Sequence, residues 1–243
     1  MNIAHFNHDT VQYFDQYTPE YDESRYSFII DRINKLKTGT SSLLDVGCGT
    51  GNILAMIRRE CGITDLHGMD CSSSYLDQAR SHLDCRIHLG SVLDRPFLQS
   101  LNKRFSFVIL GAVLHHLVGN TRKASRLLAL HAIANCLDIL DTDGYLFVHE
   151  PTFTPAVIMD LVFHIKRIVT RTTDNRVSIF GNTWNNLGAP VVSYYSKDEL
   201  CRMVNLWKGE ILEAHQNPTR LPLIFKIGLI RKSDTTIVVK KRS

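Results

Sequence analysis

The stretch Leu43-Leu44-Asp45-Val46-Gly47-Cys48-Gly49-Thr50-Gly51-Asn52 decides the fold. Two leucines lead to an acidic residue near the end of an expected strand, glycines follow at alternate positions, and a helical pattern begins at Asn52. Glycines let the backbone turn tightly and let a ligand approach without obstruction by a Cβ atom. The first turn of a helix also offers unpaired N–H groups. The stretch therefore predicts a strand, a ligand-binding turn and a helix.

Apolar strands and amphipathic helices alternate from this turn onward. The expected strands are residues 43–47, 65–70, 85–90, 105–112 and 145–150. The expected helices are residues 27–36, 52–59, 73–82 and 121–140. Such alternation predicts an α/β fold with a doubly wound, mostly parallel sheet that is covered on both faces.

The remaining segments suggest four parts. We expect an N-terminal helical lid (1–40), a cofactor-binding core (41–150), a substrate-side insertion (151–192) and a C-terminal completion of the sheet (193–243). The insertion contains an amphipathic helix that starts near Pro155 and carries one apolar stripe. Its opposite stripe, which is a solvated face or faces an anionic substrate, contains His164, Arg167 and Arg171.

The C-terminal part is expected to form a helix and an antiparallel hairpin at the edge of the sheet. The sequence Ser196-Lys197-Asp198-Glu199 is a capping box, which predicts a helix from there to about Trp207. Two probable last strands follow, at residues 210–215 and 223–230. The basic cluster at residues 240–242 is expected to be a frayed, solvated tail.

Composition excludes several classes of protein. A net charge of +4, spread along the chain, is too thin for a nucleic-acid-binding face. The six cysteines form no CxxC pair, so no metal site is indicated, and they suit free thiols in a reducing compartment. No apolar run resembles a signal peptide or a transmembrane segment, so we expect a cytoplasmic protein.

Two acidic residues refine the nature of the ligand. Dinucleotides need GxGxxG for their pyrophosphate, whereas this chain has GxGxG followed by Asn52. S-adenosylmethionine has no pyrophosphate, and Asp45 would lie near the ammonium group of its amino acid end. Asp70 ends the second expected strand, where a carboxylate can accept both ribose hydroxyls.

Several stretches together resemble the class I S-adenosylmethionine-dependent methyltransferases, over about residues 40 to 150. They are residues 43–52, the Gly-Met-Asp that ends at Asp70, Gly90-Ser91-Val92, the fourth strand with Leu114-His115-His116-Leu117, and residues 140–146. The resemblance implies a Rossmann-like methyltransferase fold and S-adenosylmethionine as the cofactor. The implied cofactor-binding residues are Asp45, Gly47, Cys48, Gly49, Gly51, Asp70, Cys71, Ser91, Val92 and Gly111. We also expect Tyr17 to lie in a lid over the cofactor and Arg25 to pair with the cofactor's carboxylate, unless this segment is simply a helix packed on the sheet.

The chain departs from this family pattern at two positions. Many members have Asp, which accepts from the adenine amino group, where this chain has Ser91. The hydroxyl of Ser91 can take that role, or Asp94 can replace it. Many members also have Asp near Ser106, where the residue usually has a structural role.

Three residues are candidates for catalysis: His115, His116 and Glu150. The fourth and fifth strands are neighbours in a sheet of this class, so their ends share one cleft, where ligands bind. Imidazole titrates near neutrality and suits proton removal from an acceptor. We favour His115 with Glu150 as the pair. A packing role for either histidine, and a structural role for Glu150 beside Pro151, remain alternatives.

The leading function is methyl transfer to a small-molecule acceptor, and we expect this acceptor to be a hydroxyl of a natural product or lipophilic metabolite. The alternatives are a protein or nucleic-acid methyltransferase, a catalytically inactive cofactor-binding regulator or scaffold, and a nicotinamide oxidoreductase. The apolar stripe after Pro155 faces either a lipophilic acceptor or a second subunit in a homodimer.

Overall fold

A seven-stranded sheet in the order β3-β2-β1-β4-β5-β7-β6 forms the centre of the protein. The computed structural model describes residues 23–172, 191–207, 209–219 and 230–242. The strands are β1 Ser42–Val46, β2 Asp65–Asp70, β3 Arg86–Leu89, β4 Phe105–Gly111, β5 Leu140–Thr154, β6 Gly209–Thr219 and β7 Arg231–Lys241. Strands β1 to β5 pair in parallel, and β7 pairs antiparallel with both β5 and β6. The predicted mixed, mostly parallel sheet is confirmed.

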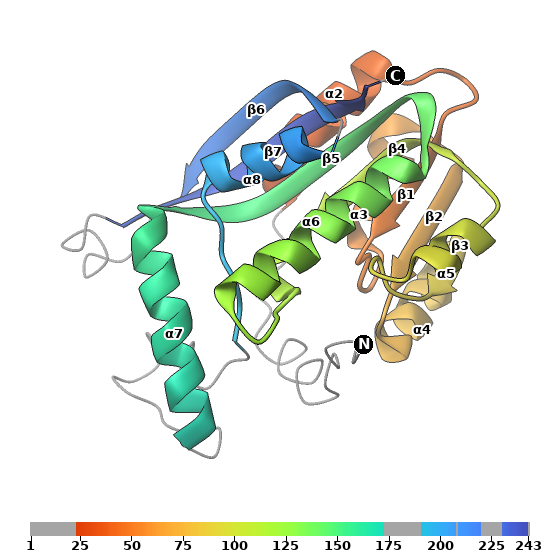
Figure 1. Ribbon diagram of the computed structural model, residues 1–243. Helices are drawn as coiled ribbons and strands as arrows, with labels where there is room; N and C mark the ends of the chain where they lie inside the picture. The colour runs from red at the N-terminus through yellow and green to blue at the C-terminus, as the bar shows by residue number, and fades with distance from the viewer. Residues whose placement is uncertain (1–22, 173–190, 208, 220–229, 243) are drawn as a thin grey trace.

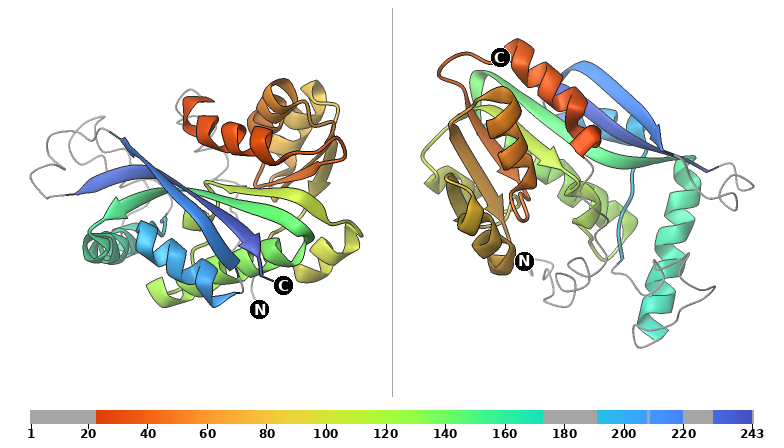
Figure 2. Two further views of the ribbon diagram at one scale, coloured as in Figure 1. Left: turned by 90° about the horizontal axis from the view of Figure 1, so that it is seen from above. Right: turned by 180° about the vertical axis from the view of Figure 1, so that it is seen from behind.

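Helices cover both faces of the sheet (Figures 1 and 2). One face, here called the α3 face, is covered by α2 Ser27–Leu36, α3 Asn52–Cys61 and α4 Ser73–His82. The other, the α6 face, is covered by α5 Arg95–Ser100, α6 Arg122–Asp138 and α8 Lys197–Leu206. Alternation along β4 supplies both cores, because Ile109 packs on the α3 face and Val108 on the α6 face.

Helix α7, Ala156–Thr172, follows the end of β5 and projects away from the sheet (Figure 1). One side is buried through Met159 and Phe163, whereas Val157 and Leu161 on another side are exposed. Two short 3-10 turns, η1 Glu23–Tyr26 and η2 Leu114–His116, complete the elements of the described residues. Within these residues, no helix is long and apolar enough to cross a membrane.

The expected and observed elements agree best where local signals are strong. Helices at 27–36 and 73–82 have the predicted bounds, and the Ser196–Glu199 capping box is formed. The prediction missed α5, a short helix capped by Asp94. The strand expected at 223–230 lies almost wholly outside the described residues.

The prediction of a frayed tail is wrong for Lys240 and Lys241. Both belong to β7, where Lys240 pairs with Tyr145 of β5 and with Glu210 of β6. The ammonium group of Lys240 also lies 2.9 Å from Asp143. Charged side chains at a strand end misled the sequence interpretation, because the backbone pairing that orders them is not local.

Candidate active site

The loop between β1 and α3 is shaped by three glycines in the left-handed region. Gly47, Gly49 and Gly51 have φ of 73°, 52° and 87°, which other residues rarely adopt. The amides of Gly47 and Cys48 both donate to the Met69 carbonyl, at 2.8 and 3.0 Å. Backbone contacts to β2 therefore hold the loop at the carboxyl end of the sheet.

Asp45 is fully buried under this loop, and neither of its carboxylate oxygens has a hydrogen-bond partner in the part of the chain that the structure describes. Burial raises the pKa of Asp45 to about 8, and the neighbouring carboxylate of Asp70 acts in the same direction. An unsatisfied buried carboxylate is costly unless a donor or cation compensates it. The ammonium group of S-adenosylmethionine is such a cation, so the residue fits the expected cofactor.

Asp70 ends β2 and is held by two backbone amides. Its Oδ2 accepts from Gly49 at 3.0 Å and its Oδ1 from Ser72 at 2.9 Å. The Cys71 amide acts on the same carboxylate. A carboxylate has about four acceptor positions, so capacity remains for a ribose hydroxyl. A Cβ atom built on Gly49 would meet no atom within 4 Å, so the loop is open there to a ligand.

The residues expected near the adenine have structural roles of their own. Ser91 Oγ accepts from the Leu93 amide at 3.2 Å, and the carboxylate of the exposed Asp94 caps α5 by accepting from Phe97. Val92 is buried, whereas Cys71 beside Asp70 is exposed. The choice between Ser91 and Asp94 for the adenine therefore stays open.

Of the lid residues, Arg25 is described and Tyr17 lies outside the described residues. Arg25 makes a bidentate pair with Asp234 of β7, at 2.9 and 3.1 Å. The structure thus gives Arg25 a different partner from the expected carboxylate of the cofactor, and that contact stays a prediction. Gly111 ends β4 and pairs with His149 of β5.

The structure brings His115 and Glu150 together on the α6 face. The His115 Nδ1 and Glu150 Oε2 atoms lie 2.6 Å apart, and the Leu114 amide donates to Glu150 Oε1, also at 2.6 Å. Burial lowers the pKa of His115, and the charges of Arg25 and Lys232 act in the same direction. Burial raises the pKa of Glu150, although the Leu114 N–H group opposes this shift.

These contacts favour a neutral His115 ring whose Nδ1–H is donated to the Glu150 carboxylate. In that tautomer the Nε2 atom carries the lone pair, so it is the atom that can accept a proton. The His116 ring lies against His115 with centroids 4.0 Å apart and the planes tilted by 41°, and burial lowers the pKa of His116 as well. The site thus contains one ionisable pair, His115 and Glu150, with His116 packed beside it.

The segment before α8 forms one wall of this cluster. The Tyr194 ring is stacked against His115, with centroids 5.3 Å apart, and it contacts Phe153 at 4.6 Å. The Ser193 amide donates to the His115 carbonyl at 2.8 Å. Aromatic surface therefore lies directly beside the candidate base.

Arg122, at the start of α6, fixes that wall and was missed by the sequence analysis. It is only 4% exposed, and its Nε donates to Asp160 of α7 at 2.7 Å. It also donates to Ser193 Oγ and to the Tyr194 carbonyl, and its guanidinium lies over the Tyr195 ring. No local pattern marks such a residue, because its partners are 38 to 72 positions away in the chain.

Arg167, in the polar stripe of α7, packs against the segment before α6. Arg167 donates to the Gly119 carbonyl and to Asn120, at 2.9 and 3.3 Å. His164 is exposed, and the side chain of Arg171 lies outside the described residues. A contact between this stripe and an anionic substrate therefore stays a prediction.

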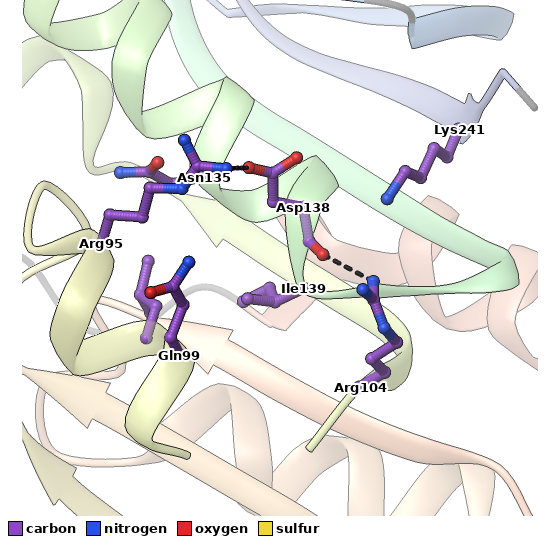
Figure 3. A pocket seen from close by; sticks show the side chains of 8 residues that line it. Arg95, Gln99, Arg104, Asn135, Asp138, Ile139 and Lys241 are labelled. Carbon is purple, nitrogen blue, oxygen red and sulfur yellow. Dashed lines mark hydrogen bonds and ion pairs between the residues drawn. The ribbon is translucent and has the colours of Figure 1, made fainter. Parts of the chain in front are cut away.

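A shallow hollow of about 200 Å³ lies at the opposite end of the sheet, far from these residues (Figure 3). The side chains of Arg95 and Asp138 form an ion pair there at 2.7 Å, and Arg104 donates to the Asp138 carbonyl. These contacts tie α5 and β4 to the end of α6. We therefore assign the hollow a structural origin.

Comparison with known proteins bears on the function. Residues 43–138 match a protein family described as a methyltransferase domain. A dTDP-3-amino-3,4,6-trideoxy-alpha-D-glucopyranose N,N-dimethyltransferase of Streptomyces venezuelae is 33% identical to the chain over 135 residues. That match covers 55% of this chain and 52% of the relative, so the chain spans about half the length of the relative.

Two solved structures share the fold over most of the chain. An S-adenosylmethionine-dependent methyltransferase from Clostridium acetobutylicum has a TM-score of 0.60 and 11% identity, covering 97% of this chain and 98% of its own. The [4+2]-cyclase SpnF has a TM-score of 0.59 and 15% identity, covering 92% and 86%. At these identities the likeness is one of fold, and one fold can serve different reactions.

Proposed function

We propose, since the chain contains a class I S-adenosylmethionine-dependent methyltransferase domain, that the whole protein transfers a methyl group from this cofactor to a small-molecule acceptor. The observation that carries the proposal is the buried 2.6 Å contact between His115 and Glu150. It lies at the carboxyl edge of the sheet, beside the loop that fits the cofactor. A base and a cofactor site are therefore on the same edge.

The bound cofactor supplies a methyl group on a positively charged sulfur. Our proposal assigns His115 the removal of the acceptor's proton, through Nε2, as the acceptor attacks that methyl group. Glu150 fixes the orientation of the ring and stabilises the imidazolium that forms. The Leu114 amide holds the carboxylate in place for that task.

We propose a hydroxyl group as the acceptor, on a natural product or a lipophilic metabolite. A hydroxyl loses its proton reluctantly at neutral pH and needs a base, which the His115–Glu150 pair offers. The aromatic wall of Tyr194 and Phe153 supports an acceptor with apolar surface. The region around α7, which follows β5, is the proposed acceptor-specific part.

An amine is the second candidate acceptor. The similar protein from Streptomyces venezuelae is named as an N,N-dimethyltransferase of an amino sugar nucleotide. An amine that binds as its ammonium form also has to lose a proton before transfer, so the same pair can act on it. A hydroxyl and an amine are distinguished by the site of the label in the product.

The first experiment identifies the acceptor. The protein is incubated with a metabolite extract and methyl-labelled S-adenosylmethionine, and labelled products are found by mass spectrometry. A labelled O-methyl product supports the proposal, and a labelled N-methyl product supports the second candidate. Cofactor binding with no labelled product from any extract would favour a regulator or a non-methylating enzyme.

The second experiment tests the pair on that acceptor. We expect His115→Ala and Glu150→Gln each to lower turnover by about 10²–10⁴-fold while cofactor affinity changes little. The double variant should lose no more than the worse single variant, because the pair acts as a unit. His131→Ala, at an exposed position of α6, is the control. Turnover within a few-fold of wild type in both single variants contradicts the assignment of the pair. A severe effect of His116→Ala alone would identify His116 as the base instead of His115.

A further inference from the structure

Three buried side-chain atoms lack a hydrogen-bond partner among the described residues. Two are the carboxylate oxygens of Asp45, and the third is Nε2 of His149. Both residues are at most 1% exposed. Buried polar groups in folded proteins are nearly always partnered, so each such atom calls for an explanation.

All three atoms belong to the α3 face of the sheet. Asp45 is paired with Ile109, and His149 with Gly111, in parallel strands, so each pair projects to one face. Ile109 belongs to the core of the α3 face. His149 is therefore on the face opposite to its neighbour Glu150, and it takes no part in the proposed base.

Gly111 lies between the two residues on this face and leaves a narrow space, with room for about one carbon atom. Strand β4 lies between β1 and β5, and His149 pairs two residues further along β4 than Asp45 does, so the backbones of the two residues are about 12 Å apart. A Cβ atom built on Gly111 would have its nearest neighbour at 3.5 Å, with Tyr26 of η1 at 3.6 Å. The Tyr26 ring also lies 4.7 Å from the His149 ring, so it forms the outer wall of this space.

We propose that His149 binds the carboxylate of the cofactor's amino acid end, while Asp45 faces the ammonium group of the same end. This inference rests on the proposed function, since it concerns the same cofactor. The strand order supports it: Asp70 on β2, Asp45 on β1 and His149 on β5 follow one another along the edge of the sheet. In S-adenosylmethionine the amino acid end follows the ribose, and its ammonium and carboxylate groups are both attached to the terminal α-carbon.

The hydrogen bonds of His149 suit an anion. Its Nδ1 lies 2.8 Å from Thr236 Oγ1, and a hydroxyl that donates there leaves Nε2 as an N–H donor. Burial lowers the pKa of His149 to about 4, so the ring is neutral and carries one such hydrogen at pH 7. Arg25, the other candidate for the carboxylate, is bound to Asp234.

The test compares two ligands that differ only in the amino acid end. S-adenosylhomocysteine has this end, whereas 5′-methylthioadenosine keeps the adenosine and the thioether but lacks it. We expect His149→Leu to weaken S-adenosylhomocysteine by about tenfold to a hundredfold, as for a hydrogen bond to a charged group. The affinity for 5′-methylthioadenosine should stay within about twofold. Calorimetric titration measures both without any acceptor.

His67→Leu is the matched control. His67 is a buried histidine of β2, 4% exposed, whose two ring nitrogens lie 3.0 Å from His88 and 3.3 Å from Asp65. It should lower thermal stability and leave the ratio of the two affinities unchanged.

Three outcomes overturn the assignment of His149. They are unchanged affinities for both ligands in His149→Leu, an equal loss for both ligands in that variant, and a selective loss in Arg25→Gln but not in His149→Leu. A wild-type protein that binds neither ligand would instead contradict the proposed function. The two failures are therefore distinguishable.

Discussion

Two parts of the carboxyl edge of the sheet are built in different ways: the β1–α3 loop with Asp45 and Asp70, here called the cofactor edge, and the cluster around His115, here called the acceptor edge. The β1–α3 loop is held by backbone amides and by glycines within a few residues of one another. The cluster around His115 is held by side chains from β5, α6 and the segment before α8, such as Glu150 and Arg122. A loop held by backbone amides can form with many different sequences, whereas the cluster around His115 depends on individual side chains. The family match at residues 43–138 covers the first edge and ends before β5.

The largest effect is expected for Arg122→Ala. The change leaves Asp160 without one partner and the nearly buried Glu199 with one cation fewer, at a cost of about 3–5 kcal/mol in unfolding free energy. Affinity for S-adenosylhomocysteine at permissive temperature should be nearly normal, because the loop is held by other contacts. Arg95→Ala, which removes an exposed ion pair, is the control and should cost less than about 1 kcal/mol. If Arg122→Ala lost cofactor affinity and acceptor affinity equally, the proposed difference between the two edges would be contradicted.

Gly49→Ala tests the cofactor-binding loop, and here the main expected effect is on cofactor affinity and not on stability. The added methyl group has room in the unliganded protein but enters the space open to the ligand, so we expect affinity for S-adenosylhomocysteine to fall by at least about a hundredfold. Gly62→Ala is a matched control, since Gly62 also has positive φ and open space around it, at the end of α3. Both variants should lose similar stability, about 1–2 kcal/mol, for the left-handed conformation. Normal binding by Gly49→Ala would show that the loop does not approach the ligand.

Asp45 gives the cofactor edge a dependence on pH. With a pKa of about 8, its carboxyl holds a proton at neutral pH, and an ammonium group beside it favours release of that proton. Affinity for S-adenosylhomocysteine should therefore rise between pH 6 and about 8, by up to about tenfold per unit. In the same range the unliganded fold should lose stability, because a carboxyl whose pKa is raised by folding stabilises the fold only while protonated.

Calorimetric titration at several pH values, in buffers of different ionisation enthalpy, measures the proton released. Asp45→Asn, which cannot titrate, should bind with an affinity that does not vary over this range. A wild-type affinity that is equally flat would mean that no cation approaches Asp45.

The smallest effect is expected for Ser106→Ala. Ser106 Oγ accepts from the Ser42 amide at 3.2 Å, and Ser42 Oγ accepts from the Ser106 amide at 3.3 Å, so the two residues join β1 and β4 far from either edge. Removing one hydroxyl should cost about 1 kcal/mol in chemical unfolding and change neither affinity nor turnover. A clear loss of cofactor affinity would give this position a role beyond the sheet.

Sequence reasoning succeeded where the signal is local. Alternation predicted the mostly parallel sheet, and the glycine pattern located the loop, because both depend on neighbours in the chain. It also placed His115 and Glu150 as a pair, since parallel strands end at one edge. It failed for Arg122 and for the pairing of Arg25 with Asp234, whose contacts cross 38 or more residues. Nothing in a single sequence indicates which of several arginines will be buried.

Strand β5 carries His149 and Glu150 next to each other, one on each face of the sheet. A strand that slips by one position exchanges its faces. A single inserted or deleted residue before this pair would turn the glutamate toward Tyr26 and the histidine toward His115, and would remove both groups from their partners. Ten consecutive pairings with β7, from Tyr145 to Thr154, hold the register against such a slip. Changes of length are therefore expected in the loops and around α7 of related proteins, and not within this strand.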